Sequence, residues 1–328
     1  MKIELLCTVT ACVAFAIGFV LFKIFIPILR KVKLGQKILE IGPAWHKSKE
    51  GTPNLGGLFF ITACAAALAT ALIICNDGIS NNIIAVMGLG VVSGLIGFVD
   101  DYVKLFKKRN KGLSAIQKLI LQFVSVAAYL FFAVKLCGVD TVISFPWGAE
   151  VDFGIFYYVI MLIAIAYIIN CANLTDGIDG LAGSIALVIC TMFLLLGINS
   201  ENPDFYIPSS ALIGALLAFL VFNFHPAKIF TGDTGSLFLG GYIVGLTMLT
   251  GSEFILIPIA GIWIIEGLSV VLQVLSFKLT GKRIFKMSPI HHHFEKCSWS
   301  EVKIVLVFSL TTVLLCGLSY YLILISGR

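Results

Sequence analysis

Residues 83–101 read IIAVMGLGVVSGLIGFVDD, an uncharged apolar run that ends in two adjacent aspartates. An apolar stretch of roughly this length crosses the hydrocarbon core of a bilayer as a helix. Charged side chains at the end of such a stretch cost free energy, and they are rare unless a function uses them. The run therefore predicts a membrane-spanning helix whose end carries chemistry.

The rest of the chain repeats this pattern of long apolar runs. Of its 328 residues, 59% are hydrophobic and only 12% are charged, and the mean hydropathy is +1.02. A soluble domain with so few charges would lack a polar surface. We predict an all-α integral membrane protein, a single domain over residues 1–328. Its ten expected spans are 4–26, 56–75, 83–99, 119–138, 154–170, 181–198, 209–222, 236–250, 254–276 and 302–325.

Basic residues are concentrated in alternate connections between these spans. Nineteen of the 23 lysines and arginines lie at the connections that follow spans one, three, five, seven and nine. Because basic connections stay in the cytoplasm, we predict that these connections are cytoplasmic and that both termini are extracytoplasmic.

The remaining connections look structural rather than chemical. Residues 139–153 hold β-branched residues around a Pro-Trp-Gly turn, which predicts a small extracytoplasmic hairpin. Residues 199–208 are expected to form a capping loop.

The ninth span contains Pro258 and Gly261, with Glu266 in its middle, and we predict that it bends.

Five aspartates lie on the predicted cytoplasmic side: Asp100, Asp101, Asp176, Asp179 and Asp233. Carboxylates near lysines and histidines suit a divalent cation and a phosphorylated ligand. Asp100 and Asp101 repel each other unless a cation neutralises them. If they lie on a helix they splay by about 100°, so we expect one to face the bundle and the other its rim. Polar helix ends and turns rich in Asn, Asp and Gly are the simpler interpretation of these segments.

Three of the five histidines are consecutive, at His291, His292 and His293. Consecutive positions rarely bring three rings to one ion, and no cysteine or HExxH partner accompanies them, so zinc is not favoured. Imidazoles near phosphate oxygens fit better. The nine cysteines contain no CxxC pair, and no Walker A sequence is present, so a disulfide framework and an ATP-driven machine are also not predicted.

Taken together and in this order, these segments resemble the polyprenyl-phosphate N-acetylhexosamine-1-phosphate transferase family. The matching pieces are HxxKxGTPxxGG over 46–57, DDYxK over 100–104, NLTDGxDGL over 173–181, Asn223 with PAxxFxGDxGS over 226–236, and PIHHHFE over 289–295. They cover nearly the whole chain. One position departs from the pattern, because Asn54 stands where threonine or serine is expected.

The resemblance implies a reaction and its surroundings. Phospho-N-acetylmuramoyl-pentapeptide would pass from UDP to undecaprenyl phosphate, giving UMP and lipid I for peptidoglycan, with Mg²⁺ as cofactor. The triple-histidine segment points to this donor rather than to UDP-N-acetylglucosamine. The resemblance also implies a multi-pass protein of the bacterial plasma (inner) membrane, a cytoplasmic-face active site, a homodimer, and a bent ninth span that shapes a lipid groove. No nucleic-acid partner is expected.

Matching positions also imply residue roles. The catalytic set is Asp100, Asp101, Asp233 and His291, with Asp233 as the metal ligand. The substrate-binding set is Lys49, Asn54, Lys104, Asn173, Asp176, Asp179, Asn223, Phe230, Gly232, His292 and His293.

Several alternatives stay open. The chain also fits a close relative that transfers N-acetylglucosamine phosphate, or an inactive scaffold. A secondary transporter would place its binding residues near the bilayer midplane, whereas only Glu266 is charged there. Within the transferase, either the lipid phosphate attacks directly or an aspartate first forms a covalent intermediate. We favour direct attack, because a phosphate monoester is largely ionised at neutral pH.

Overall fold

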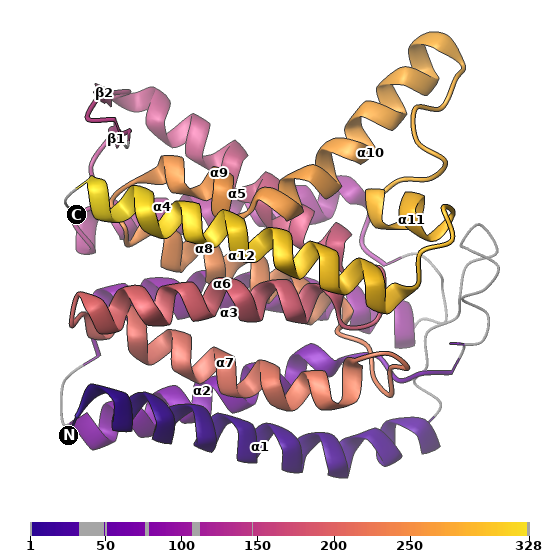
Figure 1. Ribbon diagram of the computed structural model, residues 1–328, viewed down its shortest axis with the longest axis horizontal. Coiled ribbons are helices and arrows are strands. Elements are labelled where there is room, and N and C mark those ends of the chain that lie inside the picture. The colour runs from indigo at the N-terminus through magenta and orange to yellow at the C-terminus, as the bar shows by residue number, and fades with distance from the viewer. Residues whose placement is uncertain are drawn as a thin grey trace.

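The computed structural model describes residues 2–32, 49, 51–75, 79–106, 112–145 and 147–326 as a bundle of long helices with one small hairpin (Figure 1). Its elements are α1 (Ile3–Lys31), α2 (Gly56–Cys75), α3 (Asn81–Phe106), α4 (Ala115–Leu136), β1 (Val142–Ser144), β2 (Glu150–Asp152), α5 (Ile155–Thr175), α6 (Leu181–Asn199), α7 (Pro203–Asn223), α8 (Gly232–Met248), η2 (Glu253–Ile255), α9 (Leu256–Ile259), α10 (Gly261–Thr280), α11 (Ile290–Glu295) and α12 (Glu301–Ile325).

Nine of the helices in the described residues are long and apolar enough to cross a membrane: α1 to α7, α10 and α12. The all-helical membrane class is thereby confirmed. The predicted span over 236–250 corresponds to α8, whose 17 residues are shorter than the other long helices. Nearly every residue of α8 is buried, and the helix packs against α2, α3 and α5. Its first turn carries Asp233, so the central helix of the bundle positions a predicted site residue.

Glycine lets α3 and α8 approach closely at the level of the acidic residues. A Cβ atom on Gly97 would lie 2.1 Å from the carbonyl oxygen of Asp233, nearer than any real Cβ contact. The backbone of α8 therefore rests directly on α3 one helical turn before Asp100 and Asp101. A second close approach joins Gly57 of α2 to Gly235 of α8, where a Cβ would meet backbone at 2.3 Å.

The ninth predicted span is interrupted, as expected. Helix α9 ends at Ile259 and α10 begins at Gly261, with Ala260 at ψ 12° between them. Pro258 has no N–H to donate, which weakens the helix at this point. Beyond the break α10 leaves the bundle (Figure 1), and it exposes large apolar side chains such as Leu279, which is 81% exposed.

The predicted hairpin is also present. Strands β1 and β2 pair antiparallel, with Ile143 opposite Val151. The hairpin and both chain ends lie at one end of the bundle, and α11 lies at the other (Figure 1). The capping loop expected over 199–208 is wrong from Pro203 onward, because α7 begins there. Asn202 caps that helix by accepting a hydrogen bond from the Asp204 amide at 2.9 Å, and Pro203 suits its first turn.

The α3–α8 contact generates a stability prediction. Gly97→Ala is expected to lower the thermal unfolding midpoint in detergent, because overpacking at a backbone contact costs roughly 1–3 kcal/mol. Gly88→Ala is the matched control on the same helix, since its Cβ would meet no described atom within 4 Å. It should leave the midpoint unchanged or raise it, because alanine favours helix. Equal midpoints for the two variants would contradict the contact.

Candidate functional site

A buried cluster of acids and bases forms where α3, α4 and α5 meet the start of α8. Asp233 is its centre. The Oδ2 atom of Asp233 accepts from the ammonium groups of Lys104 at 2.9 Å and Lys118 at 2.8 Å. Its Oδ1 atom accepts from the Asn173 side-chain amide at 3.0 Å. Four separate helices thus supply one polar group each to a single point.

Asp100 and Asp233 share one basic partner. The Lys104 ammonium group bridges the two carboxyl groups, at 2.5 Å from Asp100 and 2.9 Å from Asp233. Asp100 also accepts a hydrogen bond from the Leu113 amide at 2.6 Å. Two acids that share a partner require positive charge nearby, because like charges so close together cannot both ionise alone. Here Lys104 and Lys118 supply that charge.

Asp101 has different partners. Its Oδ2 atom accepts from both the amide of Thr234, at 2.9 Å, and the hydroxyl of Thr234, at 2.7 Å. The Asn54 side chain lies 3.5 Å from its other oxygen. The expectation that one of the adjacent aspartates faces the rim is wrong, since Asp100 and Asp101 are both buried, at 3% and 1% exposed. Helix α3 continues to Phe106, so both residues lie inside the bundle rather than at a free helix end.

A divalent cation suits the Asp100–Asp233 pair. Magnesium binds oxygen ligands, and protein carboxylates are its usual anchors. The side chains of Asp233 and Lys104 are 20% and 37% exposed, so an ion or a phosphate can reach this edge of the cluster. Both bonds to Thr234 already occupy one oxygen of Asp101. Asp233, together with the Asp100 carboxyl that shares Lys104 with it, could hold a metal, and Asp101 is suited to holding α8 in place.

Two glycine-containing loops complete this cluster. The Phe230 amide donates to the Pro53 carbonyl at 2.8 Å, and the Phe230 carbonyl accepts from the Gly56 amide at 2.8 Å. These bonds hold residues 53–56 against the start of α8. Gly232 has φ +75°, and a Cβ there would lie 2.8 Å from oxygens of Asn54 and Asp101. Only glycine allows the backbone to pass so close to both side chains.

Asp176 follows α5 and accepts a hydrogen bond from the Thr231 hydroxyl at 2.7 Å. Burial, and to a lesser extent the nearby carboxyl groups of Asp233, Asp101 and Asp179, raises the pKa of Asp176 well above its usual value. Asn173, Asp176 and Asp179 each contact a different partner.

A second cluster surrounds Asp179. The Lys49 ammonium group donates to Asp179 and to Glu301, both at 2.7 Å. His225 Nδ1 lies 3.1 Å from Asp179. Asn223 braces the loop by accepting from the Gly180 amide at 3.0 Å and donating to the Ile229 carbonyl at 2.9 Å.

Asp179, His225 and Glu301 also have metal-ligating atoms within 4.8 Å of one another. The Lys49 ammonium group already lies between the two carboxylates, which supplies the positive charge that a metal would provide. Lys104 lies between Asp100 and Asp233 in the same way, so the two clusters differ in access instead: the side chain of Asp233 is 20% exposed and that of Asp179 is 3% exposed.

The three consecutive histidines separate into different roles. His291 is fully buried, and its Nδ1 lies 3.1 Å from Glu266 in α10. Its Nε2 has no hydrogen-bond partner among the described residues and lies against Gly177, where a Cβ would be 2.1 Å away. His292 pairs with Glu295 at 2.5 Å. His293 accepts a hydrogen bond from the Lys286 amide at 3.1 Å, so its ring braces the loop before α11.

Residue-level reasoning from the sequence missed three members of these clusters. In the sequence, Lys118 looks like one of many basic residues. A lysine in the first turn of α4 is unfavourable next to the helix dipole, however, and this indicates that it has an acidic partner. Glu301 follows the N-cap Ser300 and looks like ordinary capping chemistry. His225 carried no local signal. His46 and the basic residues 33, 37, 47, 107–109 and 111 lie outside the described residues.

Residues 83–251 match the family model described as glycosyl transferase family 4. A Clostridium beijerinckii protein named phospho-N-acetylmuramoyl-pentapeptide-transferase is 45% identical over 307 residues, covering 93% of each chain. Proteins of the same name from Bacillus licheniformis and Bacillus cytotoxicus are 46% and 43% identical. They cover 95% and 96% of this chain, and 96% and 97% of their own lengths.

The buried Glu266–His291 pair generates a second prediction. Glu266→Ala leaves His291 without its Nδ1 partner, and a buried polar group without its hydrogen bond costs roughly 1–3 kcal/mol. Thermal unfolding in detergent should show a lower midpoint for this variant. Glu266→Gln retains a hydrogen-bonding group of the same size and should lose distinctly less. Equal loss in both variants would show that the volume of residue 266, rather than its hydrogen bond, supports α11.

Proposed function

This chain belongs to glycosyl transferase family 4, and from that premise we infer its reaction: it transfers phospho-N-acetylmuramoyl-pentapeptide from UDP to undecaprenyl phosphate, giving UMP and lipid I for peptidoglycan. It is a multi-pass membrane protein and a phospho-sugar transferase. We also propose that the reaction requires magnesium, and we propose a role for each site residue and an orientation of the protein in the membrane.

One observation carries the chemistry. The Lys104 ammonium group bridges the carboxyl groups of Asp100 and Asp233 at one end of a membrane bundle. Both substrates of this reaction carry phosphate, and the acceptor also carries a long hydrocarbon tail. They can meet only at a membrane boundary that offers positive charge. The cluster has the acids to hold a cation and the lysines to hold phosphate oxygens.

The described side chains divide the work. Asp100 and Asp233 would hold Mg²⁺, which when bound neutralises charge on the donor diphosphate and on the departing UMP. Lys104 and Lys118 would exchange part of their pairing with Asp233 for phosphate oxygens. Asp101 holds the first turn of α8 through Thr234.

The other predicted residues surround this centre. Lys49, Asp179 and Asn223 would bind the nucleotide and sugar, with Phe230 near uracil, and Asn173 orients Asp233. Asp176, which accepts a hydrogen bond from Thr231, would line the same pocket. Gly232 would let the backbone pass close to the Asn54 side chain. His291 would act on phosphate through its Nε2, while His292 and His293 support its loop.

We favour direct attack by the lipid phosphate over a covalent aspartyl intermediate. A phosphate monoester has a second pKa near 6, so at neutral pH its oxygen needs little help from a base. Asp100 is also held by the Leu113 amide at 2.6 Å and by Lys104, and a carboxylate with these bonds is a weakened nucleophile. Asp100 would instead guide the remaining proton of the acceptor.

The membrane setting follows from the same arrangement. We propose that the end of the bundle carrying the two clusters faces the cytoplasm of the bacterial inner membrane, and that the hairpin and both termini face outward. The apolar, exposed side of α10 would guide the lipid tail to the cluster. We also propose a homodimer, which the mass of the purified protein in detergent, corrected for bound detergent, would check.

A secondary transporter remains the alternative from another class. The acidic clusters gather where α5 ends and α8 begins, and the mid-span Glu266 is paired with His291 rather than facing an ion path. These contacts favour surface chemistry over transport.

The central test is UMP release by purified protein given Mg²⁺, undecaprenyl phosphate and UDP-N-acetylmuramoyl-pentapeptide. Asp233→Asn should lower the rate by about 10³-fold or more, the order lost when a charge-stabilising group is removed in phosphoryl transfer. The cause is loss of the anion that holds both the metal and the two lysines.

Asp140→Asn serves as the matched control, since Asp140 is an acid near the hairpin at the opposite end of the bundle. It should retain full activity. Chelation of Mg²⁺ should stop wild-type turnover, and added Mg²⁺ should restore it. Full activity of Asp233→Asn would remove the metal assignment, and activity that survives chelation would remove the metal itself.

The choice between the two mechanisms has its own measurement. Rapid quenching with labelled donor and no acceptor should trap no phospho-sugar attached to the protein. Detection of such an adduct that forms and decays as fast as turnover would overturn direct attack.

A further inference from the structure

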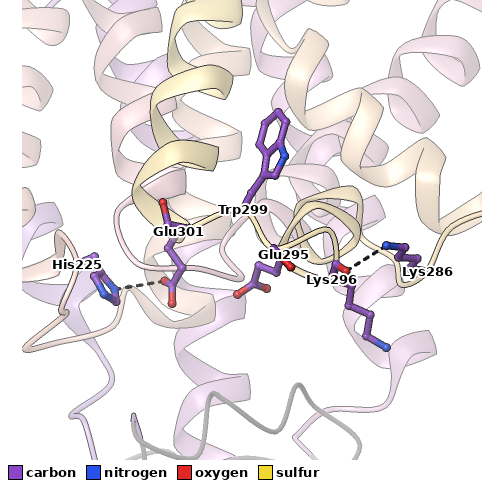
Figure 2. A pocket seen from close by; sticks show the side chains of 8 residues that line it. His225, Lys286, Glu295, Lys296, Trp299 and Glu301 are labelled. Carbon is purple, nitrogen blue, oxygen red and sulfur yellow. Dashed lines mark hydrogen bonds and ion pairs between the residues drawn. The ribbon is translucent and has the colours of Figure 1, made fainter.

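An open cavity of about 940 Å³ lies beside the Asp179 cluster. It is lined by His225, Lys286, Glu295, Lys296, Trp299 and Glu301, which come from the loop after α7, the connection around α11, and the start of α12 (Figure 2). None of the aspartates assigned to the reaction lines it. A volume near the upper end of the range for small-molecule sites has room for more than a nucleotide.

The two acids of this cavity already have basic partners. Glu295 pairs with His292, and its side chain is only 4% exposed. Glu301 accepts from the Lys49 ammonium group at 2.7 Å and from the Asp179 amide at 3.0 Å. Their negative charge is therefore largely neutralised by groups of the protein itself.

The two lysines of the cavity differ in this respect. Lys286 donates to the main-chain carbonyl of Lys296 at 3.2 Å, and no carboxylate of the described residues lies within ion-pair distance of either ammonium group. Both side chains are exposed. Trp299 forms an aromatic part of the wall; it is stacked on Phe294 with ring centroids 4.6 Å apart, and the Lys303 ammonium group lies 4.2 Å from its ring centroid. The cavity thus offers two uncompensated positive charges beside an aromatic surface.

The cavity also adjoins the substrate site. Glu301 and His225 line it, and both contact the Asp179 cluster, with His225 lying 3.7 Å from Glu301. A ligand held at the Asp179 cluster can therefore extend into the cavity without crossing the bundle.

We propose that this cavity binds the peptide of the donor, with Lys286 and Lys296 pairing with the peptide's carboxylates. The inference rests on the proposed function, which makes the donor a sugar nucleotide carrying a pentapeptide. A peptide joined to a sugar through its amino end has a free carboxylate at its other end, and acidic side chains add more. Peptide methylene and methyl groups suit the Trp299 wall. The cavity would distinguish a peptide-bearing donor from a plain sugar nucleotide.

The test measures dissociation constants for two probes, UDP-N-acetylmuramoyl-pentapeptide and UDP, on the purified full-length chain in detergent. Lys286→Ala/Lys296→Ala should weaken binding of the pentapeptide nucleotide by about two- to 25-fold, because each of the two exposed ion pairs contributes a factor of roughly 1.4 to five. Binding of UDP should not change. The difference should shrink at high salt, as screening weakens exposed ion pairs.

The matched control is Lys282→Ala/Arg283→Ala, which removes two positive charges from the same loop without touching the cavity lining. It should bind both probes like wild type. Unchanged unfolding midpoints for both double variants would show that the fold is intact. The proposal is overturned if the Lys286/Lys296 variant binds the pentapeptide nucleotide normally, if it loses UDP equally, or if the control variant shows the same loss.

Anionic phospholipid headgroups share the chemistry of the peptide carboxylates, so the measurement is repeated with phosphatidylglycerol added to the detergent. Strong competition by this lipid at the cavity, with no peptide-dependent difference between the probes, would assign the lysines to lipid and overturn the proposal. Failure of the proposed function looks different, because wild-type protein would then release no UMP from the pentapeptide nucleotide.

Discussion

The arrangement of the site depends on one close backbone contact. Helix α8 rests on Gly97 of α3, so that the first turn of α8 lies beside Asp100 and Asp101. Without that approach the Asp233 carboxyl would not reach Asp100, and Lys104 would not bridge them. Because no side chain separates α3 from α8 at Gly97, Asp100 and Asp233 are brought close together. Lys104 and Lys118 compensate their negative charge in a bundle of low polarity.

The acidic residues that the sequence brings to notice have at least three physical roles. Asp100 and Asp233 share Lys104 and suit a cation, which could reach them through the partly exposed Asp233. Asp101 accepts two hydrogen bonds from Thr234 and so orients the central helix α8. Asp179 belongs to a separate network with Lys49 and Glu301, and Glu301 also lines the cavity. Similar residues in similar motifs therefore have different partners and belong to different networks.

The histidine segment shows how a short motif divides among neighbouring structures. His291 turns inward onto Glu266 of α10, which connects the bent ninth span to the Asp176–Asp179 loop. His292 turns toward Glu295 at the cavity, and His293 braces the preceding loop. A movement of α10 would therefore reach the substrate loop through a single buried carboxylate–imidazole contact.

Length and order of the apolar runs were enough to determine the membrane class, the long helices, the broken ninth span and the connections that carry the acids, because these depend on local composition and on residues such as Pro258. The motifs could also be identified from the sequence, because each is a contiguous segment. Tertiary structure alone decided the pairings: Lys49 with Glu301, Lys118 with Asp233, and the burial of both Asp100 and Asp101. The helices are apolar on nearly every side, so their sequences do not indicate which faces meet. Those contacts join residues more than a hundred positions apart, and only the packing of whole helices brings them together.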